Sequence, residues 1–346
     1  IDLLDAGQPV GIFGLRKAGK TSLIQRLQGK LVRRPIAFVD TQGTASQRGV
    51  WPLYPTIIAA FVTAIRRMRP DLKLPVLALY PDAGEPTPET PEHFLHDLRL
   101  LHGALGSPTE KERMLLIVDE IDRLLPDDTT PGYEGFTAFF GQLRAANQQA
   151  HLLDVLVAGV DPAINRYECW EERDNEFYRA LHELWVPPMA PADVREMIES
   201  LGWQMGVRYE AKALTLLAQG GGGHPFVIRQ MCSYAVKERL GRGAITVTLE
   251  QAQTAIEEFI FQDPYLRELW DKRLNEIQCE MLRILARSSS PVPRSHLLPP
   301  AQRQAALAAL KGLEEYTLIR RTKEGYIIAW NVLRNWVRWV ELGLDA

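Results

Sequence analysis

The 346-residue sequence lacks several features that mark whole classes of proteins. It has no run of about 18 uncharged apolar residues, so no transmembrane helix is predicted, and its opening residues show no signal-peptide pattern. Its three cysteines form no CxxC, and its seven histidines show neither HxH nor HExxH spacing, so no zinc site is predicted. We therefore expect buried free thiols, a reducing, cytoplasmic location and no membrane partner.

No excess of one charge is present either. The net charge is −3, from 40 basic and 43 acidic residues, which gives no reason to expect a dedicated nucleic-acid binder. Apolar residues make up 46% of the chain, enough for a sizeable core, and the length suits two or three domains. The segment from Ile1 to Gly7 resembles the last turns of a helix with a C-cap glycine. Because so short a helix is unstable alone, we expect the native chain to continue upstream.

The first half alternates apolar strands with helices. Strands are predicted at residues 9–14, 36–40, 114–118 and 153–158, with a last one at 185–188, and helices at 21–31, 55–68, 94–105 and 136–150. The Pro-rich stretch 80–92 is predicted to be an exposed loop. Continuous rather than alternating apolar strands indicate a parallel sheet covered by helices on both faces, the α/β architecture of P-loop NTPases.

The second half changes character. Helices are predicted at residues 192–201, 211–218, 226–240 and 249–261, and we interpret them as an all-helical lid. Helices at 277–286 and 301–316, followed by strands 318–321 and 326–329 joined through Glu324-Gly325, are typical of a winged helix, and an amphipathic helix at 332–342 follows. The predicted domains are an NTPase core at 1–188, a lid at 189–270 and a winged helix at 271–346.

One motif carries specific chemistry. The segment GLRKAGKT, from Gly14 to Thr21, matches GxxxxGK[ST] and lies between a predicted strand and a predicted helix. Its backbone N–H groups would surround a β-phosphate, the Lys20 ammonium would reach the β- and γ-phosphates, and the Thr21 hydroxyl would bind Mg²⁺. The predicted nucleotide contacts are Gly14, Lys17, Ala18, Gly19, Lys20, Thr21 and Ser22.

A second motif follows the strand at 114–118. Asp119 would hold Mg²⁺ through water, and Glu120 would orient or deprotonate the attacking water, so Glu120 and Lys20 are the predicted catalytic residues. Two acids at a strand end are by themselves a weak signal, and a solvated strand end is the default. Behind a P-loop the functional interpretation prevails.

Other positions leave alternatives open. Asp161, after the strand at 153–158, is a candidate sensor near the γ-phosphate, but a turn built by Asp-Pro is at least as good an interpretation. Arg166 and Arg173 are candidates for an arginine finger, against the simpler interpretation of solvated surface charges. Gly223-His224-Pro225 opens a helix with ordinary N-terminal chemistry.

Together, GLRKAGKTSL, LLIVDEIDRLL and the GHP segment at the start of a lid helix resemble the STAND NTPases, signal-transduction ATPases with numerous domains that are related to AAA+ proteins. The resemblance implies ATP or ADP with Mg²⁺ as ligands, slow hydrolysis of ATP to ADP and phosphate, and a switch that opens and forms homo-oligomers. It also implies a role in bacterial defence or signalling, with effector and sensor domains outside this sequence. It assigns Pro225 to packing on the adenine and, more weakly, His224 to the same site.

Two departures qualify the resemblance. The family's motif upstream of the P-loop has no match here, and the sensor arginine that AAA+ machines carry after the lid glycine is replaced, with Arg229 the nearest. The alternative is an origin-recognition or loader ATPase, which has a similar DEID string and binds DNA through its winged helix. Residues 275–346 hold 10 Lys/Arg against 7 Asp/Glu, and the helix at 301–316 is neutral, so DNA is not the favoured partner.

Overall fold

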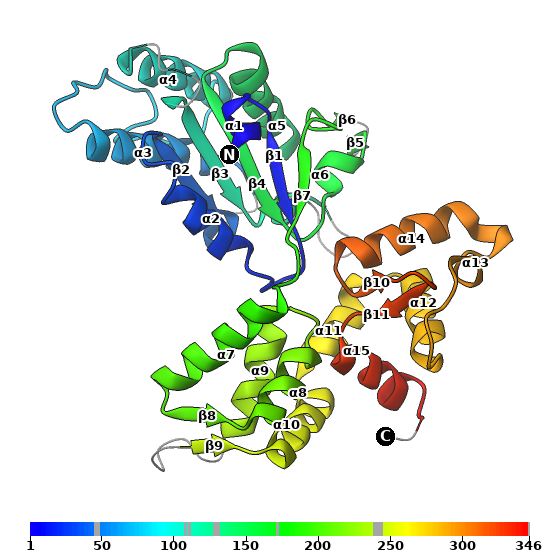
Figure 1. Cartoon of the computed structure of the whole chain (residues 1–346). Coiled ribbons are helices and arrows are strands. Elements are labelled where there is room, and N and C mark those ends of the chain that lie inside the picture. The colour runs from blue at the N-terminus through cyan, green and yellow to red at the C-terminus, as the bar shows by residue number, and fades with distance from the viewer. Residues whose placement is uncertain are drawn as a thin grey trace. The chain divides into compact units, whose positions relative to one another are not determined.

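The computed structural model describes residues 1–44, 49–106, 109, 112–126, 132–170, 173–237 and 245–344. The chain divides into two compact units, Ile1–Val186 and Pro187–Ala346 (Figure 1). The boundary lies close to the predicted end of the NTPase core. The predicted division of the second unit near residue 270 stays a prediction.

A five-stranded parallel sheet forms the centre of the first unit, in the order β2-β3-β4-β1-β7. The strands are β1 (Val10–Phe13), β2 (Ile36–Asp40), β3 (Met114–Asp119), β4 (Leu153–Gly159) and β7 (His182–Trp185). Every residue of β1, β3 and β4 is buried, which explains their continuous apolar sequences. The sheet confirms the predicted α/β fold of P-loop NTPases.

The last strand differs from the prediction. It ends at Trp185, where the sequence placed its start. Pro187 and Pro188 have no N–H to donate to a strand ladder, so the segment after Val186 cannot continue the pairing. The sequence does not indicate β7 as a strand, because it is not an apolar run. The strand lies at the sheet edge and begins with His182 and Glu183.

Helices cover both faces of this sheet (Figure 1). They are α1 (Asp2–Asp5), α2 (Lys20–Gln28), α3 (Leu53–Met68), α4 (Thr90–Ala104), α5 (Phe136–Arg144) and α6 (Ala163–Arg166). One buried cluster joins α3, α4 and α5 to the sheet, and a second joins α1 and α2 to it. The predicted helix at 136–150 is real, but its last turn, Ala145–Gln149, is a π-turn. A small unpredicted hairpin pairs β5 (Cys169–Trp170) with β6 (Arg173–Asp174).

The second unit begins with α7 (Pro191–Gln204), α8 (Ala211–Gly220), α9 (Pro225–Val236), α10 (Leu249–Gln262) and α11 (Pro264–Arg273). The prediction of an all-helical lid is wrong in one respect, because β8 (Val207–Tyr209) pairs in parallel with β9 (Ile245–Val247). Strands of three residues are too short for a periodic sequence pattern. The unpredicted α11 starts where the Asp263 carboxylate accepts a hydrogen bond from the Tyr265 N–H.

The remainder of the second unit follows the predicted order of helices and hairpin. It contains α12 (Glu276–Arg287), α13 (Arg294–Leu297), α14 (Arg303–Glu315), the antiparallel pair β10 (Ile319–Arg321) and β11 (Tyr326–Ile328), and α15 (Asn331–Trp336), which runs on into the π-turn Val337–Glu341. We call residues 276–341 the helix–hairpin module. Its core includes Trp330 and Trp336, both essentially inaccessible.

Two sequence-based expectations about the whole chain can be compared with the structure. No helix in the described ranges is long and apolar enough to cross a membrane. The three cysteines are free, but only Cys279 is buried, and Cys169 on β5 is exposed. The expectation of buried thiols is therefore wrong for Cys169, which lies on a two-residue strand with little to cover it.

Candidate functional site

The predicted phosphate-binding loop connects β1 to α2, as its sequence requires. The Lys20 side chain lies inside the loop and is only 5% exposed; its Nζ donates hydrogen bonds to the carbonyl oxygens of Gly14, at 2.9 Å, and of Leu15, at 3.1 Å. Gly19 precedes the helix at a φ of 103°, in the left-handed region that glycine adopts at least cost. Lys17 and Ser22 are exposed, and Ala18 is half-buried. The loop thus surrounds the Lys20 ammonium with its own carbonyl oxygens. The phosphate oxygens of a bound nucleotide could take the place of these carbonyls.

The two predicted magnesium ligands meet directly. The Thr21 hydroxyl donates a hydrogen bond of 2.8 Å to Oδ2 of Asp119, across the carboxyl ends of β1 and β3. Asp119 is buried, and its other oxygen accepts from the N–H of Glu120 at 2.9 Å. A hydroxyl and a carboxylate side by side are oxygen donors of the kind that Mg²⁺ prefers. The residues present therefore fit the ion that the sequence predicts.

Glu120 is held by its backbone. It adopts a φ of 56°, which is uncommon for a residue with a side chain, and such conformations gather at functional sites. The Thr41 hydroxyl, directly after β2, donates to the carbonyl oxygen of Glu120 at 2.8 Å. The Glu120 carboxylate lies 3.8 Å from Nε of Arg123 on the 3₁₀ turn Ile121–Leu124. Neither Thr41 nor Arg123 was predicted from the sequence. Thr41 belongs to no motif, and Arg123 lies in the LLIVDEIDRLL segment at a position to which no role was assigned.

The electrostatics bring a third acid into the site. Burial lowers the pKa of the Lys20 ammonium below its usual 10.5, and the negative charges of Glu120, Asp122 and Asp119 oppose this shift. Asp122 was not predicted as a site residue. Its Oδ1 accepts a hydrogen bond from the Val160 N–H at 2.9 Å, which ties the turn after β3 to the loop after β4. The only sequence signal for it was its place in the DEID string.

The residues with open alternatives are also located. Asp161 accepts a hydrogen bond from the Ala163 N–H at 2.9 Å, the geometry of the turn interpretation. Arg166 pairs with Glu183 at 2.6 Å and lies over the Trp185 ring. Arg173 is exposed on β6. A role for either arginine in a neighbouring protomer stays a prediction.

The GHP segment lies in the second unit, at the start of α9. His224 is the N-cap, and its Nδ1 accepts from the Val227 N–H at 3.5 Å. Its Nε2 is 3.2 Å from the Tyr265 hydroxyl on α11, and its ring centroid lies 4.9 Å from that of Trp330, directly before α15. Only 4% of His224 is exposed, so its side chain packs inside this unit, and its place at the nucleotide site stays a prediction. Pro225 is half-buried at the first helical position, and its predicted contact with adenine stays a prediction.

The parallel sheet, the loop after β1 and the acids at the end of β3 define the fold of a P-loop NTPase. Two solved structures share this fold over nearly the whole chain. The Walker-type ATPase Paby2304 of Pyrococcus abyssi matches with a TM-score of 0.60 and 16% identity, over 95% of this chain and 90% of that one. The ORC2 protein of Aeropyrum pernix, solved in ADPNP–ADP complexes, matches with a TM-score of 0.52 and 14% identity, over 99% of this chain and 91% of that one. At these identities the likeness is one of fold. No model of a known protein family and no curated protein matches the chain.

Proposed function

We propose that the chain binds ATP and ADP with Mg²⁺ and hydrolyses ATP slowly. The observation that carries the proposal is the meeting of Lys20, Thr21 and Asp119 at one edge of the sheet, with Glu120 beside them. On binding, phosphate oxygens would take the place of the Gly14 and Leu15 carbonyls around the Lys20 ammonium. Thr21 and Asp119 would hold the ion, which neutralises phosphate charge, and Glu120 would orient the water.

The finer proposal is a STAND-like switch. Its support is the packing of His224 against Tyr265 and Trp330, which joins the proposed nucleotide-sensing segment to the helix–hairpin module, the proposed winged helix. Because these side chains are in direct contact, a change in the position of Pro225 would be transmitted to the helix–hairpin module without passing through a flexible segment. In this proposal ADP favours a closed state, ATP favours an open one that forms homo-oligomers, and effector and sensor domains lie outside this chain. The setting would be bacterial defence or signalling, in the cytoplasm.

The test identifies the nucleotide that the protein retains. The chain is purified, denatured and analysed for released nucleotide, alongside Lys20→Ala. ADP retained by the wild type and absent from the variant is the expected result. A site that purifies empty, takes up ATP freely and turns it over faster with added DNA would contradict the switch.

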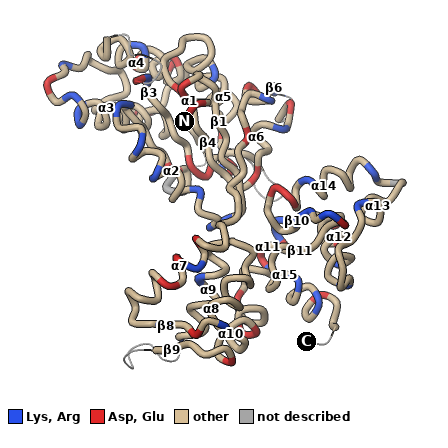
Figure 2. Tube along the Cα trace, in the orientation of Figure 1, with Lys and Arg blue, Asp and Glu red and all other residues tan. Residues whose placement is uncertain are grey.

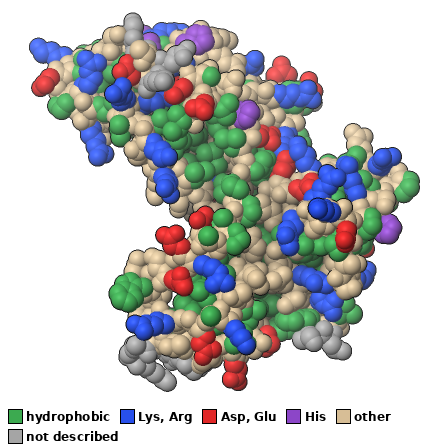
Figure 3. All heavy atoms as spheres, viewed as in Figure 1, with side chains coloured by type: hydrophobic (Ala, Val, Ile, Leu, Met, Phe, Trp, Pro, Cys, Tyr) green, Lys and Arg blue, Asp and Glu red, His purple; other side chains and the backbone are tan. Residues whose placement is uncertain are grey.

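A second candidate is a DNA-binding ATPase of the origin-recognition type. One observation favours it: the hairpin exposes Arg320, Arg321 and Lys323, and Arg294 on α13 and Arg303 at the start of α14 are exposed as well. Figure 2 marks basic positions along α14 and β10, and Figure 3 shows basic side chains over the same region. Such a surface suits phosphate contacts.

The two candidates separate in a salt titration. Binding of a labelled DNA duplex is measured by fluorescence anisotropy, with the triple change Arg320→Ala, Arg321→Ala, Lys323→Ala. Affinity that falls steeply with salt, and by about tenfold or more in the variant, supports the DNA-binding candidate, because each phosphate contact adds to the salt dependence. Equally weak binding by the wild type and the triple variant would rule out the DNA-binding candidate.

A further inference from the structure

A pocket of about 490 Å³ lies at the other end of the sheet from the P-loop. The residues that line it precede three neighbouring strands. Residues 7–9 come before β1, residues 147, 148 and 151 come before β4, and residues 179–182 lead into β7. The P-loop, in contrast, follows β1. The four residues of β1 separate the two places by roughly 13 Å at 3.3 Å per residue. The pocket is therefore distinct from the proposed nucleotide site.

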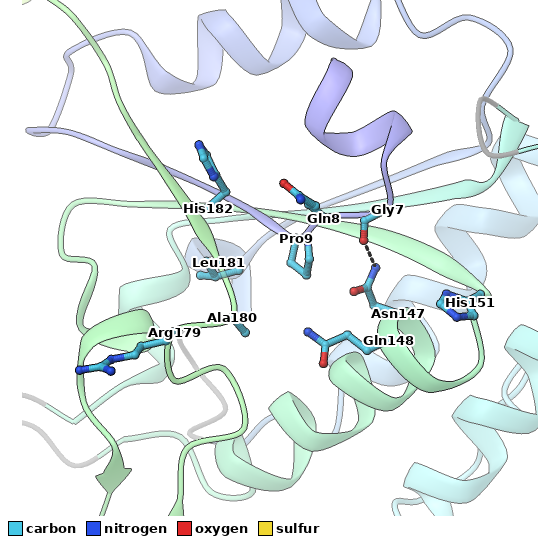
Figure 4. A pocket seen from close by; sticks show the side chains of 10 residues that line it. All are labelled: Gly7, Gln8, Pro9, Asn147, Gln148, His151, Arg179, Ala180, Leu181 and His182. Carbon is cyan, nitrogen blue, oxygen red and sulfur yellow. Dashed lines mark hydrogen bonds between the residues drawn. The ribbon is translucent and has the colours of Figure 1, made fainter.

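A buried acceptor faces this pocket. Asn147 is 1% exposed, and its Nδ2 donates to the carbonyl oxygen of Leu153 at 3.0 Å and to that of Gly7 at 3.5 Å. Its Oδ1 is buried and has no hydrogen-bond partner among the described residues. Figure 4 shows this amide turned toward the space between Pro9 and Gln148. Leaving a buried acceptor unsatisfied is unfavourable, so the site is suited to a ligand that brings an N–H or O–H group.

Two of the segments that line the pocket have an uncommon backbone conformation. The π-turn Ala145–Gln149 carries Asn147 and Gln148, and π-turns are frequent at functional sites. His151 and Arg179 adopt φ values of 50° and 53°, in the left-handed region that residues with side chains seldom occupy. The turn at Arg179 brings Ala180 and Leu181 to the wall.

The lining chemistry narrows the ligand. No aspartate or glutamate in the described chain lines the pocket, so a cation would find no counter-charge. Arg179 extends away from the centre (Figure 4), and its guanidinium lies 4.9 Å from the centroid of the Tyr178 ring, so the inner part holds no fixed positive charge either. The rest of the lining consists of the amides of Gln8, Asn147 and Gln148, the imidazoles of His151 and His182, and the apolar Pro9, Ala180 and Leu181.

Amide side chains combine donors and acceptors, and they pair with the edges of heterocyclic bases, whose flat faces rest on apolar surface. We propose that this pocket binds a nucleobase, either of a free nucleoside or of an unpaired nucleotide in a single strand. Oδ1 of Asn147 accepts a hydrogen bond from a ring or amino N–H of the base. The Oε1 of Gln148 already accepts from Arg144 Nε at 3.0 Å, so Gln148 donates from its Nε2 to a neighbouring acceptor on the base edge. The proposal rests on the cavity and is independent of the P-loop assignment.

The test titrates the full chain separately with adenosine, guanosine, cytidine and uridine, and with a mixed-sequence single-stranded oligonucleotide, by isothermal calorimetry. Nucleosides carry no phosphate, so they lack the group that a P-loop grips. The deciding variant is Gln148→Ala, and its matched control is Gln149→Ala, the exposed next residue outside the pocket. Ala180→Phe fills the cavity, and Lys20→Ala reports on the P-loop. Circular dichroism checks the fold of each, and Gln148→Ala decides alone if Ala180→Phe does not fold.

We expect a nucleoside to bind the wild type, Gln149→Ala and Lys20→Ala equally, to bind Gln148→Ala about tenfold more weakly, and not to bind Ala180→Phe. The same pattern with the oligonucleotide alone supports the proposal and assigns the base to a nucleic acid. Three results overturn it: no binding of any probe, loss of binding in Lys20→Ala, or equal loss in Gln148→Ala and Gln149→Ala.

Discussion

Asp122 and Gly159 lie so close together that a methyl group on Gly159 would overlap the Asp122 carboxylate. The same carboxylate accepts the hydrogen bond from the Val160 N–H. The end of β4 and the turn after β3 are therefore fixed to each other beside Lys20. This contact requires glycine at position 159, because a larger residue would not fit.

Gly159→Ala should slow ATP hydrolysis by about tenfold or more, because a shift of even 1 Å in a catalytic group can cost 100-fold. Nucleotide affinity should change much less, since the P-loop is not displaced. Steady-state phosphate release and nucleotide affinity are measured together. Gly141→Ala on α5 is the control, because its added carbon meets only ordinary contact with Glu176 at 3.6 Å. Unchanged hydrolysis in Gly159→Ala would show that the contact has no catalytic consequence.

Asp119→Asn should abolish the magnesium-dependent part of ATP binding and leave binding in EDTA nearly unchanged. Asparagine keeps an acceptor for the Thr21 hydroxyl but removes the charge that the ion needs. The affinity with Mg²⁺ should fall by at least about tenfold, a typical loss even for residues that only support metal ligands.

A neighbouring aspartate provides the control for this experiment. Asp40 ends β2 opposite Asp119 in the sheet register and is exposed. Asp40→Asn removes the same charge from the same edge without touching Thr21. Equal losses in the two variants would mean that the ion responds to the general field of this edge, and Asp119 would lose its assignment as a ligand.

The sequence predicted those features that depend on local patterns. Buried β3 and β4 are continuous apolar runs, and GLRKAGKT places Lys20 and Thr21 by its spacing alone. Asp122, Thr41 and the buried Oδ1 of Asn147 could not be predicted, because their surroundings depend on segments that only the folded sheet brings near. The burial of His224 shows the same limit, because it follows from Tyr265 and Trp330, far along the chain. The nucleotide contact that the family resemblance implies for His224 stays a prediction.

Trp330→Ala should lower the stability of the second unit by about 3–5 kcal/mol, the usual loss for a buried aromatic side chain. Tyr265→Phe should cost about 1 kcal/mol, since it removes only the hydroxyl next to His224. Denaturant unfolding followed by circular dichroism gives both values. Trp203→Ala is the matched control in the same unit, because Trp203 is 75% exposed. Similar effects of the two tryptophan variants would contradict the packing role of Trp330.

A buried charge cluster at the amino ends of the strands should be a major source of stability in the first unit. Asp154, the second residue of β4, is fully buried and pairs with Arg34 and, at 3.0 Å, with Arg113. Asp154→Ala removes the carboxylate that the two guanidinium groups share and leaves Arg34 only its longer contact with Asp5, at 3.6 Å. We therefore expect the free energy of unfolding to fall by about 3–5 kcal/mol.

The exposed ion pair of Arg144 and Glu176 provides the control for Asp154→Ala. Their side chains are 43% and 45% exposed, so Glu176→Ala should cost at most about 1 kcal/mol. The double change Arg34→Met, Asp154→Leu should recover much of the loss, because well-packed apolar residues commonly replace a buried ion pair at little cost. Thermal unfolding of the four proteins measures this. If Asp154→Ala were as mild as Glu176→Ala, solvent would have to reach the cluster, and the amino edge of the sheet would be more open than its burial indicates.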